Sequence, residues 1–354
     1  MSEGGKYQRR LLITGGTGFI GANLIQHLVD CYPDYLLVNL DALTYAANPA
    51  SLKNVAGKDN YRFIKADIRD RSRLIETAGI FDFDGVIHLA AETHVDQSIV
   101  DPEKFVATNI VGTFNLLEMS RQIAAKKPAF RFHQVSTDEV FGALTNAHLF
   151  SEKSPYRPNS PYAASKAAAD HLVRSYQRTY GIDCITTNCC NNFGPYQFPE
   201  KLIPLVIRNA CNDQPIPVYG DGGNIRDWLY VTDHCRAIDM AFHNGVSGET
   251  YNVGGRTELA NIDIVRRVCR LLDKLLGGQP REQLITFVKD RPGHDFRYAI
   301  DPAKIEKELG WRPRLSFDEA LETTVKWYLA HRDWLESCIS GEYLKYYDRQ
   351  YSQE

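Results

Sequence analysis

The sequence has no long hydrophobic run and no excess of either charge. No stretch approaches the roughly 18 uninterrupted apolar residues that a membrane-spanning helix needs. The 41 basic and 44 acidic residues give a net charge of −3, which indicates no broad attraction to nucleic acid or to an anionic membrane. We therefore expect no nucleic acid and no membrane among the partners, and any anionic ligand must be held by local groups.

Metal-ligand and disulfide patterns are also missing. The 8 cysteines show neither Cys-x-x-Cys spacing nor a paired Cys/His arrangement, so the sequence predicts no metal site. Residues 1–10 are polar and basic, and the apolar run that follows them, Leu11 to Ile13, is too short for a secretion signal. Free thiols in a reducing compartment are the simplest interpretation, and we expect a cytoplasmic protein.

Short apolar segments alternate with longer helical ones in the first half of the chain. Segments that are apolar on both faces are typical of strands buried in a parallel sheet. The alternation predicts an α/β protein with a doubly wound parallel sheet. Strands are predicted over residues 10–14, 36–40, 61–64, 86–90, 130–136 and 184–188, and helices over 18–31, 102–125 and 160–180.

After about Asn191 the segments become irregular and rich in Gly, Pro and Asn, as in 191–196 and 219–223. The length of 354 residues suits one large domain or two modest ones. We expect a dinucleotide-binding domain over 1–190. Residues 191–354 should form mainly a smaller substrate-binding domain of loops and short helices, with some later segments returning to the sheet.

A glycine-rich turn follows the first predicted strand and opens the first predicted helix. Gly15, Gly18 and Gly21 allow a tight turn, close approach of backbone to a pyrophosphate and close helix–strand packing. Glycines alone are weak evidence, but the strand–turn–helix context predicts a Rossmann dinucleotide site.

Acidic residues end the next two predicted strands. Asp41 can accept hydrogen bonds from the adenosine ribose and would repel a 2′-phosphate, so NAD is favoured over NADP. Asp67 and Ile68 should lie beside the adenine, although an Asp at a strand end is also a common helix cap.

Tyr162 and Lys166 are four residues apart in a predicted helix, which places both on one face. A lysine ammonium near a tyrosine favours the phenolate and should lower the tyrosine pKa. Such a tyrosine can take a proton from an alcohol while hydride leaves the same carbon. This spacing is common by chance, but it is stronger evidence for a catalytic pair here, because it follows a fifth predicted strand that ends in Ser136 and Thr137.

These motifs resemble the extended short-chain dehydrogenases/reductases and, among them, the dTDP-glucose 4,6-dehydratase family. The resemblance runs from about Leu11 to Tyr328. It includes residues 39–41, 88–96, 136–140, 191–201, 226–228 and 290–295. The chain departs from the family pattern at Ala42, Phe141, Cys190 and Phe193.

The resemblance implies an enzyme that oxidises C4 of the glucose, eliminates water across C5 and C6, and reduces C6 with the same tightly bound NAD. It assigns an acid role to Asp138 and a base role to Glu139, beside Thr137, Tyr162 and Lys166. Adjacent carboxylates tend to split their pKa values, so one can stay protonated.

The resemblance also implies the binding residues and a partner. The substrate would be a nucleotide-diphosphate-glucose, and the helices at 102–125 and 160–180 would pair into a four-helix homodimer interface, although their apolar residues could be ordinary core. Residues implied to bind NAD are Gly15, Gly18, Phe19, Ile20, Gly21, Asp41, Ala42, Leu43, Thr44, Asp67, Ile68, Leu89, Ala90, Ala91, Thr108, Tyr162, Lys166 and Asn192. Residues implied to bind the substrate are Thr93, Thr137, Asn191, Lys201, Leu202, Pro217, Val218, Tyr219, Arg226, Asn261, Arg291 and His294.

Two other functions remain open at this point. A UDP-sugar 4-epimerase or decarboxylase would share the scaffold, but it would not need both Asp138 and Glu139. A non-catalytic NAD-binding scaffold would be expected to lose one of the catalytic groups, and all are present. The residues themselves do not distinguish thymidine from uridine, nor do they identify the deoxysugar pathway.

Overall fold

A seven-stranded parallel sheet forms the centre of the computed structural model, which describes residues 6–144, 148–290 and 292–339. The strand order is β10-β6-β5-β4-β1-β2-β3. The strands are β1 (Arg9–Thr14), β2 (Tyr35–Asp41), β3 (Tyr61–Lys65), β4 (Gly85–His88), β5 (Arg131–Thr137), β6 (Asp183–Cys189) and β10 (Thr250–Val253). The doubly wound α/β class is confirmed. The strand predicted over 86–90 ends earlier, at His88.

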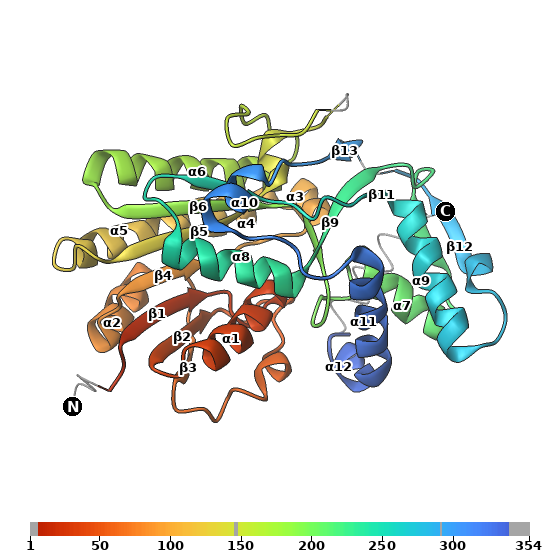
Figure 1. The fold of residues 1–354 in the computed structure, drawn as a ribbon, viewed down its shortest axis with the longest axis horizontal. Helices are drawn as coiled ribbons and strands as arrows, with labels where there is room; N and C mark the ends of the chain where they lie inside the picture. Colours follow the sequence, from red (N-terminus) through yellow and green to blue (C-terminus); the bar gives the residue numbers. More distant parts are fainter. Residues whose placement is uncertain (1–5, 145–147, 291, 340–354) are drawn as a thin grey trace.

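Helices cover both faces of this sheet (Figure 1). Alternate residues of β1 enter different cores: Leu11 and Ile13 belong to one cluster and Leu12 to the other. Each such side chain contributes about 1.5–3 kcal/mol when fully buried. The first cluster includes residues of α1 (Phe19–Cys31) and α8 (Val231–Asn244), and the second includes residues of α2 (Arg71–Phe81), α5 (Thr113–Ala124) and α6 (Pro161–Tyr180).

The segment predicted as one helix over 102–125 is helical but not uniform. It consists of α4 (Pro102–Phe105), a π-helical segment η2 (Val106–Gly112) and α5, and it follows α3 (Val95–Val100). The π-helical turn widens the backbone at Asn109, whose side-chain amide donates to the carbonyl of Glu92 and to Ser165 Oγ at 3.0 and 2.8 Å. Such π segments frequently mark functional sites. The two hydrogen bonds of Asn109 connect this segment to α6 and to the loop after β4.

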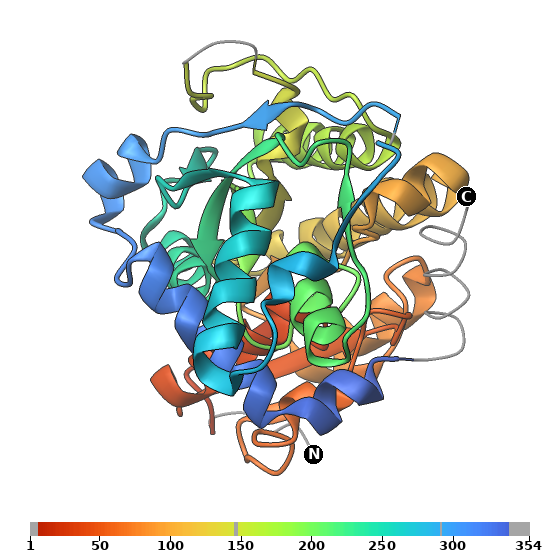
Figure 2. The ribbon, with the colours of Figure 1, turned by 90° about the vertical axis from the view of Figure 1, so that its right-hand side faces the viewer.

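The second half of the chain is more regular than the expected loops and short helices, because α9 (Asn261–Leu276) alone has 16 residues. Strand β10 does return to the main sheet, whereas β9 (Ile225–Tyr230) pairs with β7 (Asn191–Phe193), β11 (Glu258–Ala260) and β13 (Arg297–Tyr298), and β8 (Ile216–Tyr219) pairs with β12 (Ile285–Val288). In Figure 2 the helices of this half, in cyan and blue, lie in front of the red and orange strands of the first half. The remaining elements are η1 (Pro49–Leu52), η3 (Asp138–Phe141), α7 (Leu202–Cys211), η4 (Arg281–Leu284), α10 (Ala303–Leu309), α11 (Phe317–Ala330) and α12 (Arg332–Ser337).

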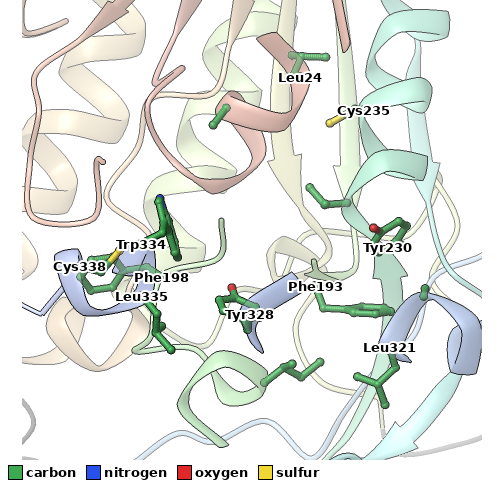
Figure 3. Packing of buried hydrophobic residues seen from close by; sticks show 14 of the residues in the cluster. Leu24, Phe193, Phe198, Tyr230, Cys235, Leu321, Tyr328, Trp334, Leu335 and Cys338 are labelled. Atoms are coloured by element: carbon green, nitrogen blue, oxygen red, sulfur yellow. The ribbon is translucent and has the colours of Figure 1, made fainter. Parts of the chain in front are cut away.

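A shared hydrophobic core joins α1 to the elements after β6 (Figure 3). Phe193 is buried, and its ring centroid lies 5.7 Å from that of Tyr230 and 5.2 Å from that of Phe317. The Tyr328 hydroxyl on α11 donates to the carbonyl of Gln197 at 2.7 Å. These contacts fix the loop after β7 against α11. Within the described ranges, no helix is long and apolar enough to cross a membrane.

Candidate active site

A cleft lies at the carboxyl ends of the parallel strands, where ligands bind in open α/β sheets. Its lining includes Gly15 after β1, Asp41 at the end of β2, Leu89 after β4, Thr137 at the end of β5 and Cys189 at the end of β6. The topology therefore brings the predicted dinucleotide turn and the predicted catalytic residues into one site.

The glycine-rich turn is closely packed, as predicted. Gly15 has a φ of +73°, and a Cβ placed there would lie 2.7 Å from Ala90 Cα. A Cβ on Gly21 would lie 2.2 Å from the carbonyl oxygen of Gly15. The turn leads into α1, and the unpaired backbone N–H groups of a first helical turn attract anions. This cradle fits a dinucleotide pyrophosphate.

Two carboxylates near the cleft have protein partners. Asp41 accepts hydrogen bonds from the backbone N–H groups of Thr17 and Leu43, at 3.0 and 2.8 Å, so it also orders the turn. Asp67 forms an ion pair with Arg69 at 2.6 Å. Burial raises the pKa of Asp67, but the hydrogen bonds from Arg69 outweigh burial and lower it. Arg69 also lines the cleft, but its guanidinium already binds the Asp67 carboxylate.

The predicted catalytic residues Thr137, Asp138, Glu139, Tyr162 and Lys166 all line the cleft. Strand β5 ends at Thr137, and the chain turns at once into η3, so both carboxylates follow the strand edge directly. Asp138 is 1% exposed. Burial, followed by the charges of Glu139 and Asp227, raises its pKa well above the usual range of a carboxyl group. A carboxyl that keeps its proton in neutral solution can act as a general acid.

Tyr162 and Lys166 are both buried on α6. Burial and the charge of Glu139 raise the pKa of Tyr162 well above 10, although its hydrogen bond with Thr137 lowers it. The expected net lowering of the Tyr162 pKa is therefore wrong in this structure, where burial is the largest effect. The Lys166 ammonium donates to the carbonyl of Val135 at 2.8 Å, and burial lowers its pKa.

All but one of the residues predicted to bind the cofactor line the cleft. The exception is Leu43, whose backbone rather than side chain is used, as a donor to Asp41. The fit of the glycine turn, Asp41 and the Tyr162–Lys166 face indicates NAD. Cleft residues that the prediction missed include Arg69, Glu92, Lys104, Gln197 and Glu200. The position of Glu92 just after a strand could have indicated it, whereas the others depend on loop packing.

The residues predicted to bind the substrate fall into two groups. Thr93, Thr137, Asn191 and Lys201 line the cleft. Arg291 lies outside the described residues. The others are absent from the cleft lining, namely Leu202, Pro217, Val218, Tyr219, Arg226, Asn261 and His294.

Most of this second group gathers around β8, β9 and the segment before β13. Arg226 donates to the carbonyls of Ile225, Phe296 and Asp295 and lies over the ring of Tyr298 at 4.5 Å. The Tyr298 hydroxyl donates to the Asp295 carboxylate. Arg226 is only 4% exposed, and the charge of its guanidinium lowers the pKa of Asp138 in the cleft.

Tyr219 and His294 lie together nearby. Their rings meet edge-on with centroids 6.2 Å apart, the Tyr219 hydroxyl donates to Asp96 at 3.2 Å, and His294 Nδ1 contacts Asp290 at 2.6 Å. Within the described residues, no group of three or more His, Cys, Asp or Glu side chains is arranged to hold a metal.

Comparison with known proteins gives the family. A model of the family described as GDP-mannose 4,6 dehydratase matches residues 12–324. The dTDP-glucose 4,6-dehydratase of Neisseria meningitidis serogroup B is 52% identical over 346 residues, which cover 95% of this chain and 97% of that protein.

Solved structures agree. The dTDP-glucose 4,6-dehydratase of Streptomyces venezuelae, solved with NAD and TYD bound, is 45% identical, with a TM-score of 0.86 over 93% of this chain and 100% of that one. The UDP-glucose 4-epimerase of Thermus thermophilus, in complex with NAD, shares the fold at 28% identity, with a TM-score of 0.82 over 91% of this chain and 99% of that one. By identity and coverage, the chain belongs to the dTDP-glucose 4,6-dehydratase family.

Proposed function

We propose that the protein is an NAD-dependent hydro-lyase that converts dTDP-glucose to dTDP-4-keto-6-deoxyglucose in deoxysugar biosynthesis. The observation that carries this proposal is the position of Asp138 and Glu139. Both follow β5 and line the cleft with Tyr162 and Lys166. A 4-epimerase needs the hydroxyl, the tyrosine and the lysine, whereas dehydration also needs an acid and a base.

The residues divide the proton transfers among them. When bound, NAD would supply the redox chemistry, accepting a hydride from C4 and returning it to C6, so it would be restored in each turnover and would stay bound. Tyr162 takes the proton of the 4-hydroxyl while Thr137 hydrogen-bonds to the same oxygen. Because burial and Glu139 raise the pKa of Tyr162, this step needs a nearby cation. We assign that role to Lys166, which is buried one helical turn away on α6.

The new ketone acidifies C5–H, so Glu139 can remove that proton. Asp138, whose raised pKa keeps its proton available, protonates the departing C6 oxygen, and water leaves. C5 is then reprotonated after C6 has been reduced.

The proposal also covers substrate recognition, the oligomeric state and the cellular location. Thr93, Asn191 and Lys201 would hold the sugar and diphosphate, and the second group described above would hold the nucleotide, with Arg291 among them. Exposed apolar side chains at Val100, Val106 and Val111 support a homodimer through a four-helix bundle. The eight free cysteines suit a cytoplasmic location.

Solvent exchange tests the proposed chemistry. In deuterium oxide the wild-type product should have lost one water and gained one deuterium at C5. The Glu139→Gln variant should still reduce the bound cofactor but incorporate no deuterium at C5. The matched variant Glu76→Gln, on the exposed face of α2, should behave as wild type. Retained exchange in Glu139→Gln would remove Glu139 from its role, and conversion of the sugar to galactose would favour an epimerase.

A further inference from the structure

Asp170 is a buried carboxylate behind the catalytic face of α6. It is 4% exposed and does not belong to the cleft lining. It follows Lys166 by one helical turn, so the two side chains project from the same side of α6. A buried carboxylate is costly unless hydrogen bonds and an opposite charge compensate it.

Two hydroxyl groups hold this carboxylate in place. Ser136 Oγ, near the end of β5, donates to Asp170 Oδ2 at 2.6 Å, and the Tyr156 hydroxyl donates to the same oxygen at 3.2 Å. Ser136 directly precedes Thr137, so Asp170 is tied to the strand end that carries the catalytic hydroxyl. Burial raises the pKa of Asp170 overall, although the charge of Lys166 and the hydrogen bonds from Ser136 and Tyr156 oppose this rise and favour the carboxylate.

The other titratable groups that face Lys166 are neutral in neutral solution. Burial raises the pKa of Cys189, on β6, to about 12. Burial, followed by the charge of Lys166, lowers the pKa of His88, on β4, to about 3. Tyr156, the titratable neighbour of Asp170, has its pKa raised by burial and by the Asp170 charge. Asp170 is therefore the carboxylate that favours the charged form of buried Lys166.

We propose that Asp170 is a positioning residue that keeps Lys166 protonated, and that Ser136 and Tyr156 fix the carboxylate for this purpose. The Lys166 ammonium donates a hydrogen bond to the carbonyl of Val135. Asp170 supplies the balancing negative charge from the next turn of α6. The inference rests on the proposed function, in which a charged Lys166 assists proton removal by Tyr162.

The rate of cofactor reduction in a Glu139→Gln background isolates this first step, because elimination is blocked there. Adding Asp170→Asn should make Lys166 lose its proton at lower pH. With dTDP-glucose, reduction followed by absorbance should therefore be about 10- to 100-fold slower at pH 9, with a smaller loss at pH 6. Asp170→Glu should restore part of the rate. Tyr156→Phe, which removes one hydrogen bond, should shift the profile in the same direction but less.

Asp233→Asn is the matched control. Asp233 is also a buried helical aspartate, but its partners are Arg236, at 2.8 Å, and the backbone N–H of Arg314. The Asp233→Asn variant should have a lower free energy of unfolding but an unchanged pH profile of cofactor reduction. Identical profiles in the Asp170 and Asp233 variants, or a loss in Asp170→Asn that is equal at every pH, would overturn the proposal.

Unfolding measurements test the coupling of Lys166 and Asp170 independently of the proposed function. If Glu139→Gln reduced no cofactor, the function would fail, but the Lys166–Asp170 coupling could still be measured. A lysine with a depressed folded pKa makes the folded state more stable as pH rises through that pKa. The stability deficit of Asp170→Asn relative to wild type should therefore narrow from pH 6 to pH 9. A constant deficit, as expected for Asp233→Asn, would contradict the coupling.

Discussion

Asp227 on β9 raises the pKa of Asp138, which follows β5 in the main sheet. The effect adds to those of burial and Glu139. Asp227 is itself 1% exposed and accepts hydrogen bonds from the backbone N–H groups of Gly255 and Thr257, at 2.9 and 2.7 Å. Burial raises the pKa of Asp227 itself, although these hydrogen bonds oppose the rise. The smaller sheet thus places a second buried carboxylate near the proposed general acid.

Replacing this charge should weaken the acid step at high pH. In Asp227→Asn the pKa of Asp138 should fall, so the decline of the dehydration rate on the alkaline side should begin at lower pH than in wild type. One backbone N–H would also lose its acceptor, which should cost about 1–3 kcal/mol of unfolding free energy. The pH dependence of kcat and urea unfolding would measure the two effects. If kcat declined over the same alkaline pH range in Asp227→Asn as in wild type, Asp227 would not influence the pKa of Asp138.

The close turn at Gly21 should be essential for cofactor retention. Gly21→Ala would place a methyl group 2.2 Å from the Gly15 carbonyl oxygen and so distort the turn. We expect the purified variant to contain little NAD, as judged by the nucleotide released on denaturation. Gly57→Ala is the control, because a Cβ there meets nothing within 4 Å. Full NAD content in Gly21→Ala would contradict the proposed cradle.

A carboxylate between α1 and α8 should make stability depend on acidic pH. Asp239 accepts a hydrogen bond from Tyr32 and contacts His27 and His243, each at 2.8 Å. Burial raises its pKa, but these three partners outweigh burial and lower it. Its stabilisation is therefore fully present above the ordinary carboxyl pKa and is lost as pH falls below it.

Asp239→Asn should cost about 1–3 kcal/mol of unfolding free energy at pH 7. The difference from wild type should shrink between pH 4 and pH 2, because Asp239 of the unfolded chain binds a proton in this range while the folded carboxylate stays ionised. Thermal unfolding followed by circular dichroism across this range is the measurement. Asp213→Asn, at an exposed position after α7, should show no such difference. A deficit that stays constant down to pH 2 would contradict the assignment.

Local pattern predicted the main sheet and the catalytic edge well. The run around Leu12 is buried on both faces and forms β1, and the glycines after it form the turn, because both features depend on residues adjacent in sequence. The spacing of Tyr162 and Lys166 placed both on one face of α6 for the same reason.

Features that depend on tertiary packing were not predictable in this way. The pKa of Tyr162 rises because the fold buries it, whereas sequence spacing indicated only the nearby lysine. Arg226 binds the carbonyls of Asp295 and Phe296, which lie far away in the chain. The π-helical turn at Asn109 likewise arises from contacts with Glu92 and Ser165, not from the composition of the helix.

The most direct test of the central claim is to incubate the purified protein with dTDP-glucose, without added NAD, and weigh the product by mass spectrometry. The account predicts a product lighter by one water, with no accumulated NADH, because the retained cofactor is regenerated. An unchanged mass, with NAD added and with UDP-glucose as the alternative substrate, would contradict it. In that case a hexose converted to galactose would identify an epimerase, and no reaction at all would leave a non-catalytic NAD-binding protein.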